Sequence, residues 1–392
     1  MKTKLSFILL LMAAVNLSQA DVQPYKPAMP EQIVVTVSQH DDMRKIRILR
    51  KQLRQQPDNV EVLDNIITAY KSLGRQNADE RYFAYAETVL LPYIESGTDN
   101  EILLLHWADI LQRRHEFEQS SAVLTRVLNI NPDNVNAHVQ RALMYQVRGQ
   151  YDLAMKSCRA LAGNVESLVL MICITQINSL EGKLSESLAM LQKTLRKNSS
   201  SSPAVLSWAQ TVLAEMYLRE SDYIRAEALM RKVLKADSRD YYARALYADL
   251  LIRQQRYQEV VKLLQPYIYV DKLFLRVVIA KKFLQQLDDD SLNQLQSRIS
   301  RISQFSGDEH YRLLSRYYLD VADDPGNALK LAKKNWVNQR EPDDLLLLVR
   351  CMIAAGDTVG LQYFNQWIKQ QRLQDKRIQL LLPPSLAGAA DV

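Results

Sequence analysis

The sequence is poor in glycine, which accounts for 10 of its 392 residues, where average usage of about 7% would give about 27. Phosphate-binding loops, dinucleotide-binding fingerprints and nucleophile elbows depend on glycine, because they need a positive φ or a close backbone approach. The chain contains no G-x-G-x-x-G, G-x-x-x-x-G-K-[ST] or G-x-S-x-G motif. This scarcity argues against nucleotide-dependent enzymes and against turn-rich β-folds.

The chain also lacks a strong charge imbalance. It has 50 Lys and Arg against 44 Asp and Glu, a formal charge of +6, and no basic run of five or six residues. Its five histidines show no zinc-ligand spacing with one another or with cysteine. The sequence therefore predicts no nucleic-acid partner, no metal and no cofactor.

The first 20 residues have the features of a secretory signal peptide. Lys2 and Lys4 precede an apolar run from Leu5 to Val15, and Ser18-Gln19-Ala20 places small residues where a signal peptidase reads them. We expect cleavage before Asp21, which leaves 48 basic against 44 acidic residues, a net charge of +4. The alternative is an uncleaved anchor, although the run is short for a spanning helix. No other apolar stretch approaches 18 residues, so we predict no transmembrane segment in the mature chain and a periplasmic or secreted location.

Export would place the three cysteines in an oxidising compartment. Cys158 and Cys173 are 15 residues apart, and their midpoint at Val165-Glu166 falls close to a predicted helix break around Gly163-Asn164. In an antiparallel helix hairpin such residues lie at the same height, so a disulfide is possible if both side chains face inward. The alternative is two buried thiols in the core, and Cys351, in an apolar run, is expected to be a core residue.

A repeat of about 34 residues runs through the chain. In residues 101–134, apolar residues share one helical face, a polar turn follows, and a second apolar face ends before Pro132. The plan recurs in units that begin at 135, 207 and 241, with Ser199–Pro203 as an extra loop in the longer interval. Because a two-helix unit cannot bury two apolar faces alone, it must stack on its neighbours. The sequence predicts an all-α fold, an α-solenoid of stacked helix-turn-helix repeats.

The order of small residue, aromatic residue, Gly-x-Tyr turn, alanine and terminal proline resembles the tetratricopeptide repeat (TPR) family, best in residues 101–168 and 207–268. Arg141 stands where the pattern has an apolar residue and Asn178 where it has an aromatic one, which weakens single repeats but not the period. The resemblance implies a curved superhelix that presents its first helices along a concave groove.

The expected organisation is a signal peptide (1–20), an extended proline-containing arm (21–41), a TPR array (42–270), divergent TPR-like repeats (271–378) and a flexible tail (379–392). Whether Ile33–Val37 in the arm pairs with anything stays open, as does the oligomeric state. Asp288-Asp289-Asp290 lacks the alternating pattern of a calcium loop, so we interpret it as the cap of the next helix.

By the resemblance, residues of each first helix that lie outside its core stripe would line the groove. These candidates for partner binding are Asp64, Lys71, Asp109, Gln112, Asn136, Gln146, Trp208, Glu215, Tyr242 and Asp249. The alternative is that each is an ordinary surface residue. The mixed apolar, amide and acidic lining would suit an extended or helical segment with apolar and basic residues. The Lys/Asn cluster by which some TPR proteins hold a terminal carboxylate is absent.

No carboxylate pair stands in an apolar neighbourhood that would split two pKa values, and we predict no catalytic residues. The sequence favours a non-enzymatic scaffold or adaptor in the bacterial periplasm, with a protein or peptide as its partner. The alternatives are an envelope assembly factor that contacts the cell wall or an outer-membrane complex, and a helical-repeat enzyme that acts on glycans.

Overall fold

The computed structural model describes residues 41–305 and 310–382, so the predicted signal peptide and nearly all of the N-terminal arm lie outside the described residues. The first half of the described chain comprises α1 (Asp41–Gln55), α2 (Val60–Asn77), α3 (Arg81–Glu95), α4 (Glu101–Arg113), α5 (Phe117–Ile130), α6 (Val135–Val147), α7 (Tyr151–Arg159), α8 (Ser167–Leu180), α9 (Leu184–Lys197) and α10 (Pro203–Arg219). The second half comprises α11 (Tyr223–Ala236), α12 (Tyr241–Arg253), α13 (Tyr257–Leu264), the 3₁₀ turn η1 (Gln265–Tyr267), α14 (Asp271–Phe283), α15 (Asp289–Phe305), α16 (Tyr311–Asp320), α17 (Pro325–Asn338), α18 (Pro342–Ala355), α19 (Thr358–Gln371) and α20 (Lys376–Gln379).

Short polar sequences set the helix boundaries. The side chains of Asn100 and Asn134 accept backbone N–H groups at the starts of α4 and α6, as N-cap residues do. Asp288 caps the start of α15, as the sequence predicts, by accepting the N–H of Ser291 at 2.7 Å. The turn inside a repeat needs a left-handed residue, which is Gly149 (φ 69°) after α6 but Ser221 (φ 60°) after α10. A polar residue can adopt this conformation at modest cost, which lets the chain use so little glycine.

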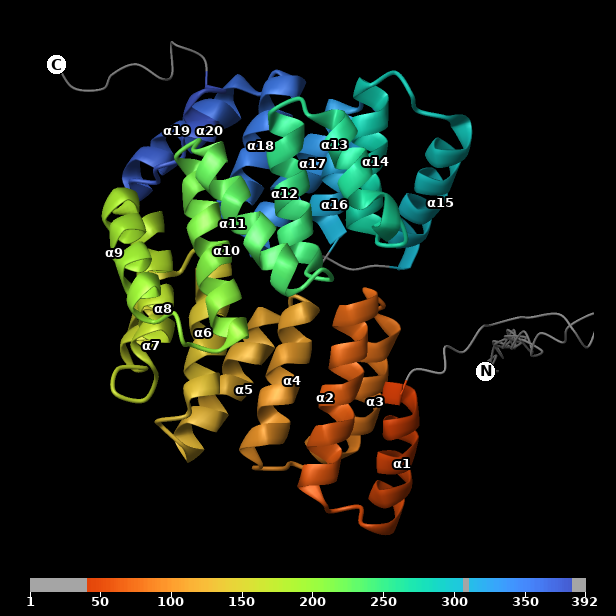
Figure 1. The fold of residues 1–392 in the computed structure, drawn as a ribbon, viewed down its shortest axis with the longest axis vertical. Helices are drawn as coiled ribbons and strands as arrows, with labels where there is room; N and C mark the ends of the chain where they lie inside the picture. Colours follow the sequence, from red (N-terminus) through yellow and green to blue (C-terminus); the bar gives the residue numbers. More distant parts are fainter. Residues whose placement is uncertain (1–40, 306–309, 383–392) are drawn as a thin grey trace, which may run out of the picture.

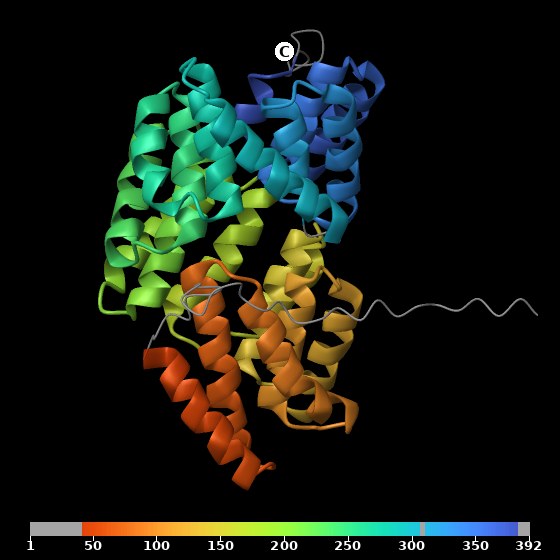
Figure 2. The ribbon, with the colours of Figure 1, turned by 90° about the vertical axis from the view of Figure 1, so that its right-hand side faces the viewer.

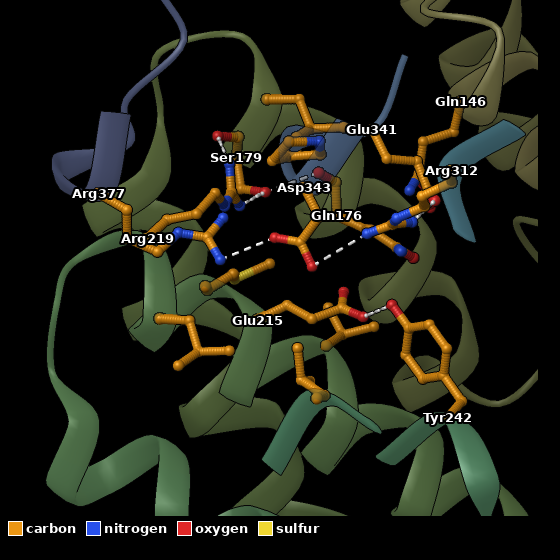
Figure 3. A pocket seen from close by; sticks show the side chains of 16 residues that line it. Gln146, Gln176, Ser179, Glu215, Arg219, Tyr242, Arg312, Glu341, Asp343 and Arg377 are labelled. Carbon is orange, nitrogen blue, oxygen red and sulfur yellow. Dashed lines mark hydrogen bonds and ion pairs between the residues drawn. The ribbon is translucent and has the colours of Figure 1, made fainter. Parts of the chain in front are cut away.

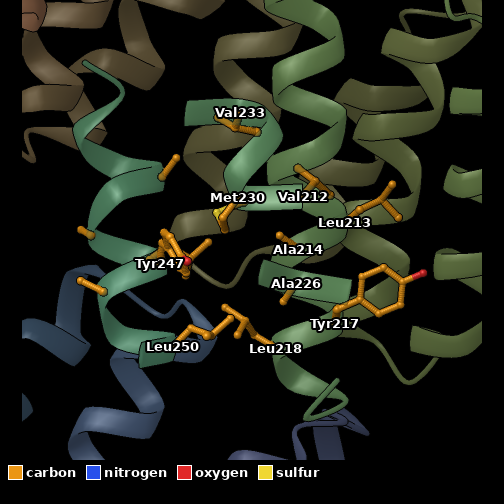
Figure 4. Close-up of a cluster of buried hydrophobic side chains, with 14 of the residues drawn as sticks. Val212, Leu213, Ala214, Tyr217, Leu218, Ala226, Met230, Val233, Tyr247 and Leu250 are labelled. Carbon is orange, nitrogen blue, oxygen red and sulfur yellow. The ribbon is translucent and has the colours of Figure 1, made fainter. Parts of the chain in front are cut away.

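Consecutive helices pair from α2 with α3 to α18 with α19, and the pairs stack side by side (Figure 1). Figure 4 shows the α10–α11 pair and its contact with α12, the first helix of the next pair. Ala214 of α10 and Ala226 of α11 are small enough to let these two helices approach. Met230 and Val233 of α11 and Tyr247 of α12 fill the space beside them, and all are buried. These are the apolar positions that the repeat predicts, and the all-α solenoid of stacked helix pairs is confirmed.

The solenoid also closes on itself, which the sequence did not predict. The first six helices form one tier, and the helices from α8 to α20 form a ring against it (Figures 1 and 2). Tyr241 at the start of α12 donates to the carbonyl of Gln76 at 2.6 Å, and the Arg340 N–H donates to the carbonyl of Val147 at 2.7 Å. Residues 142–180 share one apolar core with residues 328–382. The C-terminal repeats thus pack against the middle repeats and cover part of the expected groove.

The structure joins Cys158 at the end of α7 to Cys173 of α8, with a Cα–Cα distance of 5.6 Å, and Cys351 is buried with a free thiol. Leu381 and Leu382, assigned from sequence to a flexible tail, instead pack against the C-terminal core, because their apolar side chains complete its edge.

In the described part of the chain, no helix is long and apolar enough to cross a membrane.

Candidate functional site

The first helices of the ring surround an interior lumen that contains three adjoining cavities. We call them the acidic mouth, of about 560 Å³, the constriction, of about 40 Å³, and the basic chamber, of about 340 Å³. The mouth and the constriction share Gln176, Glu215 and Tyr242, and the constriction and the chamber share Arg312, Asp343 and Arg377. The constriction has room for only a few water molecules, so it separates two spaces that each have the volume of a ligand site.

The constriction is crossed by charged side chains from both halves of the ring (Figure 3). The Tyr242 hydroxyl of α12 donates to Glu215 of α10 at 2.5 Å, and Arg219 of α10 donates to the carbonyl of Ser179 at 2.8 Å. From the C-terminal side, Arg377 of α20 pairs with Asp343 of α18 at 2.7 Å. The lumen is therefore lined by a middle-repeat wall and a C-terminal wall.

Arg312 of α16 lies between three carboxylates at the start of α18. Its guanidinium is 3.6 Å from Glu341 and 3.4 Å from both Asp343 and Asp344. Glu341 and Asp344 also accept each other's backbone N–H in a capping box, which fixes both carboxylates at the positive end of the helix. One guanidinium group thus forms ion pairs with three carboxylates.

The acids of the lumen differ in their pKa values. Burial raises the pKa of Glu215, and burial together with neighbouring Asp344 raises the pKa of Glu341 to about 8. Burial also acts on Asp343, but Arg377 and Arg312 outweigh it and lower its pKa. The interpretation that no carboxyl groups are split in pKa was wrong, because folding brings together acids that are more than 120 residues apart in sequence.

The acidic mouth combines aromatic rings with four acids, of which two have no cationic partner among the described residues. It is lined by Trp208, Tyr242 and four carboxylates, those of Glu215, Asp237, Asp240 and Glu341. None of the described residues that line it is a Lys, Arg or His. Asp237 and Asp240 each cap a backbone N–H and take part in no ion pair with the described residues. Asp237 and Asp240 therefore supply acidic groups without a cationic partner among the described residues, in a cavity that two aromatic side chains also line.

The basic chamber has the opposite character. Asp249 of α12 pairs with Arg276 of α14 at 2.5 Å and with Arg316 of α16 at 2.8 Å. Burial raises the pKa of Asp249, but the two guanidinium groups outweigh this and lower it. The charge of Asp249, which the sequence predicted to face a partner, is therefore already paired within the chain.

The predicted groove residues fall into two separate groups. Gln146, Trp208, Glu215, Tyr242 and Asp249 line the lumen. The other five, Asp64, Lys71, Asp109, Gln112 and Asn136, belong to α2, α4 and α6 in the N-terminal tier. One continuous groove is thus not formed by the ten residues.

The predicted residues of the N-terminal tier mainly form ion pairs and hydrogen bonds with one another or with close neighbours. Lys71 pairs with Asp109 at 2.5 Å, and His106 bridges Asp64 and Lys71. Gln112 donates to Gln140 at 3.2 Å, and Asn136 is exposed. Asp109 is therefore also compensated within the chain.

The residues that the sequence missed come from the C-terminal third. Arg312, Glu341, Asp343, Arg350 and Arg377 all line the lumen. A weak signal was available, because Arg312, Arg316 and Asp320 recur every four residues and thus share one face of α16. Nothing in that spacing shows which other helix the face meets.

Comparison with known proteins gives one family match. The tetratricopeptide repeat family model matches residues 217–272, from the last turn of α10 to the start of α14. No curated protein matches the chain.

Several solved structures are similar at low identity. Pseudomonas aeruginosa PilF is 17% identical, with a TM-score of 0.39 over 53% of this chain and 93% of that one. A tetratricopeptide repeat protein from Parabacteroides merdae is 14% identical, with a TM-score of 0.34 over 80% and 100%. Human IFIT1, in a dimer with m7Gppp-AAAA, is 13% identical, with a TM-score of 0.46 over 84% and 86%.

Proposed function

We propose that this protein is a periplasmic adaptor that holds a segment of a protein partner, and that a Lys or Arg side chain of this segment enters the acidic mouth. The observation that carries the proposal is the mouth itself, where four carboxylates and two aromatic rings surround about 560 Å³ without a basic side chain among the lining residues. The proposal keeps Trp208, Glu215 and Tyr242 as partner-binding residues and adds Asp237, Asp240 and Glu341.

The chemistry of the mouth favours a cation over a neutral group. A Lys or Arg over an aromatic face gains about 0.5–2 kcal/mol, more when it is shielded from water. Carboxylates that are partly removed from water gain further from a nearby cation, since the effective dielectric constant is below that of water. A bound cation would also lower the raised pKa of Glu215 and of Glu341.

Fluorescence anisotropy with a labelled, capped peptide that alternates leucine and arginine tests the proposal directly. The reference peptide carries citrulline at each arginine position, which keeps the shape and removes the charge. We expect saturable binding of the arginine peptide and at least tenfold weaker binding of the citrulline peptide.

Variants of the mouth locate the binding. Trp208→Ala and Glu215→Gln should each weaken the arginine peptide at least fivefold. Glu186→Gln, an exposed acid on α9 that is outside the lumen, is the matched control and should bind normally. Normal affinity in a folded Trp208→Ala, Glu215→Gln double variant would exclude the mouth as the site.

The location and the partner need a separate experiment. Export is supported by the signal-like residues 1–20 and by the Cys158–Cys173 bond, which suits an oxidising compartment. Affinity purification of the tagged chain from periplasm, followed by mass spectrometry, should recover a protein partner. Recovery mainly with cell-wall or membrane fractions would favour an envelope assembly factor.

One observation favours a second candidate function, a glycan-acting enzyme. Glu215 and Glu341 line the same cavity and both have a raised pKa, as a general acid requires. Release of reducing ends from peptidoglycan that is lost in Glu341→Gln would support it. If the purified wild-type protein releases no reducing ends, the enzyme candidate is rejected and the adaptor proposal remains.

A further inference from the structure

The basic chamber holds more guanidinium groups than carboxylates. Five arginines line it, from α12, α16, α18 and α20, against the three carboxylates of Asp249, Asp320 and Asp343. It lies beyond the constriction, on the far side from the acidic mouth, and differs from it in the sign of its charge.

Each of the three carboxylates is already shared by two arginines. Asp249 lies between Arg276 and Arg316, Asp320 between Arg316 and Arg350, and Asp343 between Arg312 and Arg377. The three carboxylates of the chamber are therefore already neutralised by the arginines that share them. The remaining guanidinium N–H groups need an acceptor other than these acids.

Two arginines keep such donors. Arg253, the last residue of α12, lines the chamber and has no acidic partner among the described residues. Arg350 of α18 gives one N–H to Asp320 at 2.5 Å, which leaves its other donors unused among these residues, and its side chain is 37% exposed. The chamber is thus lined by two arginines with N–H donors that no described residue accepts.

The outer side of the chamber has an apolar wall, next to the ion pair of Lys282 with Asp323. A cavity of about 420 Å³ adjoins it and shares Phe283, Asp320, Arg350 and Leu381 with it. Leu319 and Ile353 complete this apolar wall, and Phe283 stacks on Tyr257 with ring centroids 4.8 Å apart. These residues lie at or near the C-terminal ends of α14, α16 and α18, at the end of the ring away from the N-terminal tier (Figure 1).

We propose that the chamber binds a small amphipathic carboxylate, an apolar chain that ends in one carboxylate group. The carboxylate lies between Arg253 and Arg350, where two guanidinium groups can donate to its oxygens. The chain lies on the wall formed by Phe283, Leu319, Ile353 and Leu381 and leaves through the outer cavity. A ligand of eight to ten carbons fits the volume of a small-molecule site. This site does not depend on the proposed peptide site, since the constriction separates them.

The test uses three probes with the same chain and different ends, namely octanoate, octan-1-ol and octyltrimethylammonium, each titrated into the purified protein by calorimetry. We expect one saturable site for octanoate, at least tenfold weaker binding of the alcohol and no saturable binding of the cation. Equal affinity of alcohol and carboxylate would overturn the role of the arginines. No saturable heat with octanoate would overturn the site.

Arg253→Gln removes the unpaired guanidinium and should weaken octanoate at least tenfold at an unchanged melting temperature, since it breaks no ion pair in the described structure. Arg196→Gln, which removes an exposed arginine on α9, has the same charge change and should bind octanoate normally. Ile353→Asn, at a side chain that is 40% exposed, should weaken octanoate through the apolar wall.

If Arg253→Gln and Ile353→Asn both bind octanoate as the wild-type protein does, the inference is wrong. Binding of the arginine peptide should be unaffected in both variants, so failure at one site is distinguishable from failure at the other.

Discussion

Arg377 holds α20 to α18 in the C-terminal wall of the lumen, and its removal tests how much this buried ion pair contributes to stability. The side chain is buried, and its guanidinium donates to Asp375 at 2.9 and 2.7 Å and to Asp343 at 2.7 Å. Arg377→Met keeps most of the volume but leaves two carboxylates without this cation in a buried site. Breaking a buried ion pair from one side costs about 3–5 kcal/mol, and we expect this loss at pH 7.5 by urea denaturation.

The loss should shrink in acid. In the wild-type protein the pKa of Asp343 is lowered, so its pairing contributes stability above the unfolded carboxyl pKa near 4 and loses it as the pH falls below that value. In Arg377→Met, Asp343 keeps only Arg312 as its cationic partner. It therefore takes up a proton more readily, so the variant gains relative to wild type as the pH is lowered from 7.5 toward 4.5. A loss below about 1 kcal/mol at pH 7.5 would refute the reasoning. So would a loss that stays constant with pH, because a mere packing defect would behave in that way.

A double variant separates charge from volume. Asp343→Asn combined with Arg377→Met removes one acid together with its cation. We expect part of the stability to return relative to Arg377→Met, since one of the two acids that lost Arg377 has been removed. No recovery would mean that the loss comes from packing.

Four further predictions concern the disulfide, the core, two turns and the acidic mouth. In denaturant, thiol titration should find one free thiol without reductant and three with it, and Cys158→Ala with Cys173→Ala should lower stability by about 3 kcal/mol, the value for a 15-residue loop. Met230→Ala should cost about 2–5 kcal/mol in urea denaturation, because the side chain is fully buried between α10, α11 and α12. Gly182→Ala should destabilise more than Gly163→Ala, by about 1–3 kcal/mol. Both have positive φ, but a Cβ on Gly182 would lie 2.8 Å from the Arg372 Cβ and one on Gly163 meets nothing within 4 Å. Affinity for the arginine peptide should rise from pH 6 to pH 9, because Glu341, with a pKa of about 8, becomes charged over this range, and a flat profile would remove Glu341 from the site.

The closed ring changes how the concave face of these repeats can work. The groove expected over the middle repeats is partly covered by the chain's own C-terminal helices, and one of its acids, Asp249, is paired with Arg276 of α14 and Arg316 of α16. What stays available is a set of cavities with definite charge. A partner therefore meets a lumen with an acidic and a basic compartment, and only side chains or small ligands of the right charge and size fit each one.

The sequence by itself determined the helices, their pairing and their stacking, because these depend on contacts between near neighbours in the chain. Ala214, Ala226, Met230 and Val233 recur at positions that bury them in any such stack, and the 34-residue period repeats the pattern. The same local logic placed Cys158 opposite Cys173 across one turn and Asp288 at the start of α15.

Only the tertiary structure decided which distant repeats meet. Small rotations between successive pairs add up along the solenoid, and no single sequence position encodes their sum. Ring closure pairs Lys376 of α20 with Glu220 after α10 and brings Glu341 to Glu215 across the lumen. It also converts Asp249 from an expected partner-binding acid into an internal ion pair. The sequence gives the charge of a groove residue. Whether that charge is paired within the chain depends on which helix packs against the residue in the tertiary structure.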